Sequence, residues 1–213
     1  MSSVITLMRQ LEQLTEIGLA LSAEKNLNAL LERILKAAKD LTLADGGTFY
    51  IIKDRQAHFW AAFNDSLQMA MGGSTGKAAS LGPIPLYLEN GQPNTSLVVV
   101  HTFFDEKSVC LKDVYSAEKY DFSGTRKFDE MTGYRSESML TVPIFGQDRK
   151  VVAILQLINA KDPRTHQTIP FTPIDQRVVE CLASMAAVAM TNRELFRKQE
   201  QLFNELMNRY MED

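Results

Sequence analysis

The chain has 213 residues, with 23 lysine and arginine residues against 26 aspartate and glutamate residues, which gives a net charge of −3. Hydrophobic residues make up 45% and charged residues 23%, which is typical of a globular protein and excludes a disordered or fibrous one. This near balance of charge gives no general attraction to nucleic acid or to an anionic membrane, and neither is an expected partner. The two cysteines have no metal-binding or redox spacing, which favours a cytoplasmic location.

The first 24 residues are predicted to form an amphipathic helix that dimerises. Apolar side chains, with one glycine, recur there at alternating spacings of three and four residues, which is the pattern of a coiled-coil seam. No apolar run of the length of a signal peptide or of a membrane span, about 20 residues, is present, so we expect no membrane anchor. The seam consists of Val4, Leu7, Leu11, Leu14, Gly18 and Leu21.

A second helix is predicted after Asn26, a residue type that caps helix N-termini, and it is expected to end at residues 43–47. The middle of the chain is then rich in β-branched and alternating apolar residues, which predict strands. Residues 105–134 have no clean periodicity, and we expect an irregular segment with short helical pieces. The six candidate strands are residues 48–53, 57–63, 84–88, 97–102, 138–145 and 150–159.

Beyond Pro173 the sequence predicts one long helix, because its apolar residues keep a three-four spacing and no glycine or proline interrupts them. About 37 residues at 1.5 Å each give a rod of roughly 55 Å. This exceeds the breadth of about 45 Å expected for a compact chain of this size, so the last turns must project from the body. An exposed apolar stripe on these turns would be energetically unfavourable, so we expect another helix to cover it.

A search for catalytic motifs finds none. The glycine-rich run at residues 72–77 has three residues between Gly72 and Gly76 where a P-loop has four, and Ala78 stands where a P-loop has a hydroxyl. The three histidines lie singly, without the spacing of metal ligands, and no Gly-x-Ser-x-Gly nucleophile motif occurs. We therefore expect no enzyme activity in this chain and no resident metal or cofactor.

Residues 125–144 (TRKFDEMTGYRSESMLTVPI) resemble the GAF domain family. Members of that family place a Thr-Gly-Tyr or Thr-Gly-Phe turn before a strand that ends in Val-Pro-Ile, followed by a hairpin strand similar to residues 153–159 (AILQLIN). The Asn-Lys…Phe-x-x-x-Asp-Glu signature of the family is matched at Asn159, Phe171 and Asp175, whereas Ala160 and Gln176 depart from it. Residues 120–130 are similar to GAF domains of bacterial signalling proteins that precede HD-GYP phosphohydrolase or nucleotide-cyclase outputs.

The resemblance implies an α+β fold. It comprises a six-stranded antiparallel sheet, the first and last helices on one face, and a lidded pocket on the other. We assign residues 25–193 to this domain, with a dimerisation helix before it at residues 1–24 and a coiled-coil extension after it at residues 194–213.

The pocket is expected under the irregular segment, where aromatic and polar residues alternate. An aromatic ring there would stack on a flat ligand, Asp129 or Thr125 would hydrogen-bond its edge, and Arg126 would pair with a phosphate or carboxylate. Gln156 is the one amide in an apolar strand. The alternative is that these aromatic residues belong to the core and that Arg126 pairs with Asp129. The predicted ligand-binding residues are Thr125, Arg126, Phe128, Asp129, Tyr134 and Gln156.

The leading hypothesis is a sensory domain that binds a small molecule, with a cyclic nucleotide as one candidate, and that signals to an output domain through a dimeric C-terminal helix. The alternative is a ligand-free dimerisation or interaction module. A melting-temperature shift with a small molecule would distinguish the two hypotheses.

Overall fold

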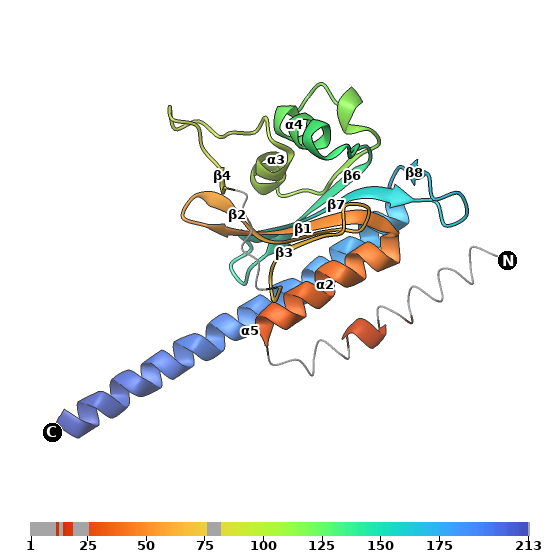
Figure 1. Cartoon of the computed structure of the whole chain (residues 1–213). Coiled ribbons are helices and arrows are strands. Elements are labelled where there is room, and N and C mark those ends of the chain that lie inside the picture. Colours follow the sequence, from red (N-terminus) through yellow and green to blue (C-terminus); the bar gives the residue numbers. More distant parts are fainter. Residues whose placement is uncertain (1–11, 13–14, 19–25, 76–81, 213) are drawn as a thin grey trace.

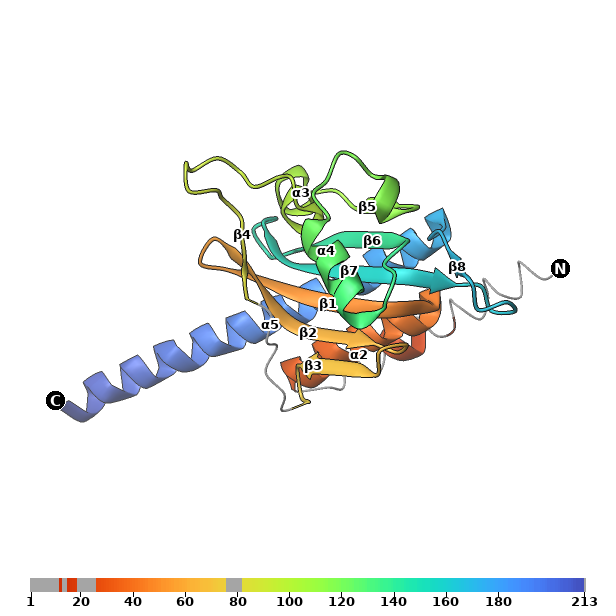
Figure 2. The same ribbon diagram turned by 45° about the horizontal axis from the view of Figure 1, so that its top comes forward.

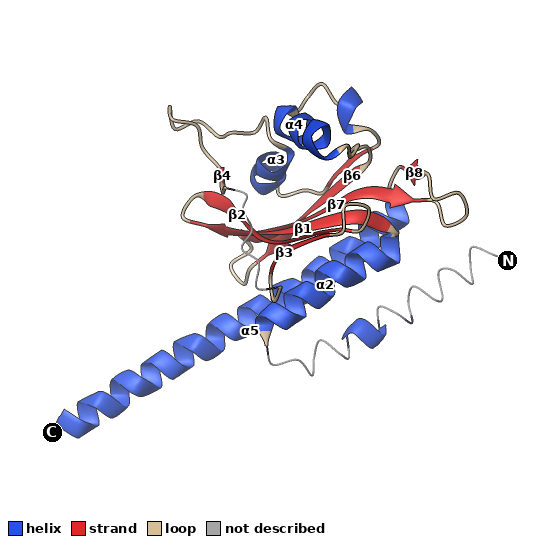
Figure 3. Cartoon of the chain, viewed as in Figure 1, coloured by secondary structure: helices blue, strands red, loops and turns tan. Residues whose placement is uncertain are grey.

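The computed structural model describes residues 12, 15–18, 26–75 and 82–212 (Figure 1). Figure 3 shows the helices and strands of the chain. The helices are α2 (Leu27–Thr42), α3 (Val98–Asp105), the 3₁₀ helix η1 (Val114–Ser116), α4 (Ser123–Thr132) and α5 (Pro173–Glu212). The strands are β1 (Ala44–Lys53), β2 (Gln56–Asn64), β3 (Met69–Gly72), β4 (Ile84–Pro85), β5 (Val109–Leu111), β6 (Met139–Phe145), β7 (Val151–Lys161) and β8 (Thr168–Ile169).

The strands form one antiparallel sheet in the order β3-β2-β1-β7-β6-β5, and the two-residue strands β4 and β8 add to β2 and β7. The six-strand path agrees with the predicted α+β fold. Long strands β1 and β7 pair at its centre, with Thr48 opposite Gln156 and Phe49 opposite Leu155. Because successive residues of a strand point to opposite faces, each of these two strands supplies one set of side chains to each layer.

Helix α2 begins and ends where its sequence predicts. The side chain of Asn26 accepts hydrogen bonds from the backbone N–H groups of Asn28 and Ala29, at 2.9 and 3.3 Å. The helix ends at Thr42, and Leu43 follows in the left-handed conformation with φ of 52°. The apolar face of α2 is buried, which confirms the second predicted helix. Its buried apolar residues are Leu30, Leu31, Ile34, Leu35, Ala38 and Leu41.

Helix α5 is the longest element, with 40 residues and therefore about 60 Å of length. Thr172 and Asp175 cap it reciprocally, because the Asp175 carboxylate accepts from the Thr172 N–H at 2.7 Å and the Thr172 hydroxyl accepts from the Asp175 N–H at 3.2 Å. Its first half packs against α2 and the sheet, and its second half projects from the body as predicted (Figure 1).

The two layers around the sheet have different characters. Helices α2 and α5 cover one face, and α3, α4 and their connections lie over the other (Figures 1 and 2). The larger core lies on the side of α2 and α5 and includes Phe49, Leu155, Leu157 and Leu182, each fully buried. On the opposite side the apolar clusters are smaller, and a cavity lies between the sheet and α4.

The prediction of a strand at residues 97–102 is wrong, because residues 98–102 belong to helix α3 and Leu97 is its N-cap. Val98, Val99 and Val100 are buried, and Thr102 is also fully buried, so the segment is covered around most of its circumference. A short β-branched apolar run of this kind fits either a buried strand or a buried helix, and periodicity does not separate the two. Packing against β6 and β7 decides for the helix.

Two further differences concern the sheet edges and the start of β1. The prediction missed β3 and β5, which have four and three residues and lie at the two ends of the sheet order. It also began the first strand at Thr48, whereas β1 begins at Ala44 and includes Gly46 and Gly47. Neighbouring side chains pack closely against both glycines, Asn64 against Gly46 and Leu35 against Gly47. Glycine within a strand often marks a close approach of this kind.

The N-terminal prediction lies mostly outside the described residues. Within it, residues 12 and 15–18 are helical, and Ile17 packs against the larger core. Across the described parts of the chain, no helix combines the length and the apolar composition that crossing a bilayer requires.

We predict that Gly47→Ala destabilises the domain by about 1–3 kcal/mol, because the new Cβ would overpack the interface of β1 with α2. It would lie 2.9 Å from Leu35 Cδ1 and 3.0 Å from Leu157 Cδ2. Urea unfolding measures the change. Gly82→Ala is the matched control, since a Cβ at Gly82 meets no heavy atom within 4 Å. Equal stability of the two variants would contradict the prediction.

Candidate functional site

A mostly apolar hollow lies between the sheet and the lid, which we define as residues 97–138. Its volume is about 390 Å³, within the range of small-molecule sites. Strands β1, β2, β6 and β7 form its floor, while α3 and the first turns of α4 form its walls. Figure 2 shows α4 lying over the sheet. Large apolar side chains dominate the lining, among them Phe59, Leu97, Val98, Phe122, Phe128 and Ile158.

A network of hydrogen-bonded side chains, with Gln156 at its centre, lies in this floor. The hydroxyl of Tyr50 donates to Gln156 Oε1 at 3.1 Å, and Gln156 Nε2 donates to Thr141 Oγ1 at 3.2 Å and to Met139 Sδ at 3.3 Å. Gln156 is 7% exposed and Tyr50 is 4% exposed. Burial raises the pKa of Tyr50 far above its ordinary value, against the opposing effect of a hydrogen bond with Thr48. The phenol therefore stays protonated and remains a donor at neutral pH.

A second tyrosine connects the lid to the start of β1. The hydroxyl of Tyr134 donates to Asp45 Oδ2 at 2.6 Å, and the Ser66 hydroxyl donates to Asp45 Oδ1 at 2.7 Å. Burial raises the pKa of Tyr134, and the hydrogen bond to Asp45 and its charge raise it further. Tyr134 is thus fixed as a hydrogen-bond donor to a carboxylate on the sheet, and the lid is attached to β1 at the rim of the cavity.

Asp129 holds the lid together from within. Its carboxylate accepts from the Tyr115 hydroxyl at 2.9 Å, from the Ser136 N–H at 2.7 Å and from the Ser136 hydroxyl at 2.9 Å. The residue is only 4% exposed. These bonds link α4 to η1 and to the segment that enters β6. The Asp129 carboxylate therefore supports the wall of the cavity rather than its surface.

The six residues predicted from the sequence divide into two groups. Thr125, Phe128, Tyr134 and Gln156 line the cavity. Arg126 and Asp129 lie outside its lining. Arg126 is exposed, and its guanidinium lies 5.5 Å from the centre of the Tyr115 ring. The residue pairs Arg126–Tyr115 and Asp129–Tyr115 show that this side of α4 faces the rest of the lid.

Several lining residues were not predicted as ligand-binding residues. Thr48 and Tyr50 belong to β1, Phe59 and Phe63 to β2, and these strands lie far from the lid in sequence. Tyr50 could have been inferred as a lining residue from the position of Gln156. Thr48 lies opposite Gln156, and Tyr50, two residues further on, points to the same face of the sheet. That inference requires the register of β1 against β7, which single-strand periodicity does not provide.

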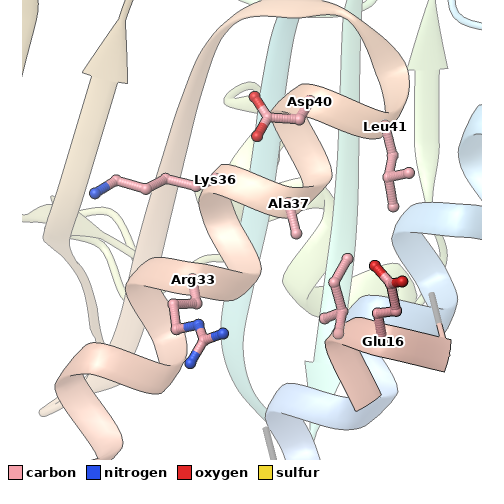
Figure 4. Close-up of a pocket in the computed structure, with 7 residues that line it drawn as sticks. Glu16, Arg33, Lys36, Ala37, Asp40 and Leu41 are labelled. Atoms are coloured by element: carbon pink, nitrogen blue, oxygen red, sulfur yellow. The ribbon is translucent and has the colours of Figure 1, made fainter. Parts of the chain in front are cut away.

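A second hollow, of about 330 Å³, lies between α2 and the helical residues 15–18 (Figure 4). Figure 4 shows the charged side chains of Glu16, Arg33, Lys36 and Asp40 around it. Within the described residues, no group of three or more histidine, cysteine, aspartate or glutamate side chains is arranged to hold a metal ion. The cavity under the lid has the more apolar lining of these two hollows, and we take it as the candidate ligand site.

The GAF domain family model matches residues 26–190. The chain belongs to the GAF domain family. It is 26% identical to the dual 3′,5′-cyclic-AMP and -GMP phosphodiesterase 11A of Takifugu rubripes over 90 residues. These residues are 42% of this chain and 9% of that protein. A Drosophila melanogaster phosphodiesterase 11 is 24% identical over 100 residues, 47% of this chain and 6% of that protein. The chain thus spans less than a tenth of the length of these curated relatives.

Solved structures confirm the GAF fold. The GAF domain of a phosphoenolpyruvate-protein phosphotransferase from Coxiella burnetii superposes with a TM-score of 0.65 at 16% identity, covering 90% of this chain and 98% of that chain. The free methionine-R-sulfoxide reductase of Neisseria meningitidis gives a TM-score of 0.58 at 14% identity, with 87% and 91% covered. The same fold thus occurs in a domain of a larger protein and in an enzyme, and identities this low establish the fold alone.

The GAF signature residues of this chain have structural roles. Asn159, with φ of 58°, accepts from the Glu137 N–H at 2.7 Å and donates to the Arg135 carbonyl at 2.7 Å, so it fixes the chain before β6. Phe171 is in the core, and Asp175 caps α5. Asn159 and Asp175 thus hold the ends of β7 and α5 against their neighbours.

We predict that Asp129→Ala lowers the free energy of unfolding by about 2–4 kcal/mol, because three donors lose a charged acceptor and the Ser136 N–H is left buried without one. Urea unfolding measures the loss, and Glu130→Ala on the exposed side of the same helix is the control. A variant as stable as that control would show that Asp129 does not hold the lid.

Proposed function

We propose that this GAF domain is a non-catalytic sensor that binds a small molecule in the cavity under the lid and signals to an output domain. The observation that carries the proposal is the cavity itself, with apolar walls and a few fixed polar groups on its floor. Such a lining stabilises a ligand by removing apolar surface from water, and the polar groups orient it.

The contacts of the cavity support binding rather than catalysis. Its polar side chains hydrogen-bond to one another, as Tyr50 does with Gln156 and Tyr134 with Asp45. Both tyrosine pKa values are raised, so neither phenol supplies a base at neutral pH. Cysteines Cys110 and Cys181 are both free and lie outside the lining, and free thiols agree with the proposed cytoplasmic location.

Cyclic nucleotides are candidate ligands because the chain is similar to phosphodiesterases of cyclic AMP and cyclic GMP. The similarity covers less than half of the chain in each case. The chemistry of the lining residues therefore decides the class of ligand.

We further propose that the signal leaves through a homodimer of α5. Beyond residue 192 this helix is exposed, and it carries a stripe of large apolar side chains at three-four spacing, which a second α5 in a coiled coil would cover. Ligand binding changes the output only if two arrangements of the helices exist and the ligand prefers one of them. The exposed apolar residues are Leu195 (46%), Phe196 (60%), Leu202 (61%), Phe203 (61%), Leu206 (60%) and Met207 (46%).

The competing function is a ligand-free dimerisation module, which the exposed stripe of α5 supports equally well. The two functions differ in whether a small molecule must occupy the cavity. A module of this kind needs α5 but not the cavity, so its activity would survive occlusion of the cavity.

Thr48→Trp is expected to abolish ligand binding, because it places a large side chain on the cavity floor between Ala62 and Gln156 in a strand that tolerates aromatic residues. Melting temperatures of the wild type are measured with a metabolite panel that includes cyclic AMP and cyclic GMP. A ligand at a hundred times its Kd stabilises the wild type by about 2.7 kcal/mol and leaves the variant unchanged. Thr165→Trp, on an exposed turn, is the control and keeps the shift.

Loss of binding in both tryptophan variants, or in neither, would argue against the cavity as the site. No shift of the wild type with any compound would favour the ligand-free module.

The double variant Phe203→Glu, Leu206→Glu is expected to be monomeric, because charges would replace two members of the apolar seam of α5. Sedimentation equilibrium gives about twice the chain mass of 24.0 kDa for the wild type and the single mass for the variant. Gln201→Glu, on the opposite side of the helix, is the control and stays dimeric. One mass for all three proteins would remove α5 as the dimer contact.

A further inference from the structure

The wall of the cavity at the first turn of α4 is acidic. Asp121, Phe122, Gly124 and Thr125 all line the cavity, so this turn faces the ligand space. Asp121 Oδ1 accepts from the Ser123 N–H at 2.8 Å. The carboxylate therefore occupies the place at the start of the helix where an anionic group of a ligand would otherwise meet backbone N–H groups.

Asp121 is ionised at neutral pH. Hydrogen bonds from the backbone and the side chain of Ser123 hold the pKa of this carboxyl below its ordinary value, and Arg126 lowers it further. Among the described residues that line the cavity, Asp121 is the one with a formal charge. Asp121 is exposed, so it lies at the rim of the cavity. A phosphate or carboxylate of a ligand beside α4 would thus lie near a negative charge that solvent partly screens.

The cations nearest to this wall are engaged elsewhere in the lid. Arg126 lies over the Tyr115 ring at 5.5 Å and is exposed. Lys119 Nζ lies 3.0 Å from His101 Nε2, outside the cavity lining. Arg126 lies near enough to lower the pKa of Asp121, but neither cation belongs to the cavity lining, in which Asp121 is the charged residue among those described.

The floor of the cavity offers one hydrogen-bond donor that a neutral ligand can use. One of the two amide contacts of Gln156 Nε2 is with Met139 Sδ at 3.3 Å, and a thioether sulfur is a weak acceptor. A carbonyl, hydroxyl or ring-nitrogen acceptor of a ligand replaces this contact with a stronger one. The side chains of Phe59 and Phe128 supply apolar surface around it.

We propose that the cavity takes an uncharged aromatic molecule with a hydrogen-bond acceptor, and that Asp121 excludes ligands that carry a phosphate or carboxylate. This inference rests on the proposed ligand-binding function and specifies the chemical class of the ligand. A cyclic nucleotide, which carries a phosphate, is on the excluded side.

The test is isothermal titration of the full chain with matched aromatic pairs that differ in charge. Adenosine is compared with cyclic AMP, and indole-3-acetamide with indole-3-acetate. We expect the neutral member of a pair to bind more tightly by about tenfold or more, because a like charge across the cavity opposes the anion. Asp121→Asn strengthens anion binding by about tenfold and changes the affinity for the neutral member by less than about twofold.

The amide oxygen of the Asp121→Asn variant can still accept from the Ser123 N–H, so this bond before α4 is retained, and a melting curve verifies the fold. Glu130→Gln is the control, because it removes an acid from the same helix outside the lining and leaves the neutral-to-anion ratio unchanged. An anion that binds the wild type as tightly as its neutral partner, or a ratio that Asp121→Asn does not alter, would overturn this inference while leaving the proposed function in place. Binding of none of the four probes counts against both.

Discussion

The register of β1 against β7 is the constraint on which both halves of this domain depend. Thr48 lies opposite Gln156, Phe49 opposite Leu155, and Tyr50 opposite Ile154. Since side chains alternate along a strand, Phe49 and Leu155 enter the core with α2 and α5, while Thr48, Tyr50 and Gln156 form the cavity floor. A shift by one residue would place the amide in the core and phenylalanine in the cavity, so one pairing specifies both faces.

The cavity and helix α2 share strands β1 and β7, and α5 packs against α2 and β6. The proposed ligand and α5 would therefore be separated only by the sheet and α2. Gly47 allows Leu35 of α2 to approach β1 closely on one side, and its backbone also borders the cavity on the other. The Tyr134–Asp45 bond adds a second connection, because Asp45 follows the end of α2 by only three residues. Under the proposed function, a ligand in the cavity would act by favouring one of two discrete arrangements of the helices that cover the sheet.

Charge divides the lid into an inner and an outer surface. Asp121 borders the cavity, whereas Arg126 and Lys119 lie toward the outside. Asp129 is buried between them and serves the lid by accepting three hydrogen bonds. Residues that are close in sequence therefore have three different roles, set by the direction in which each side chain leaves α4 and the turn before it.

The sequence by itself determined the helices α2 and α5 and both central hairpins, because caps, turn residues and apolar periodicity are local signals. The family was indicated separately, by the resemblance of residues 125–144 and 153–159 to GAF domains. It also indicated four cavity-lining residues, among them Tyr134 and Gln156. The tertiary structure decided that residues 97–102 form a helix and that Arg126 and Asp129 lie outside the cavity. It also brought Tyr50 to Gln156, 106 positions away. These outcomes depend on strand register and on packing between distant segments, which no local pattern encodes.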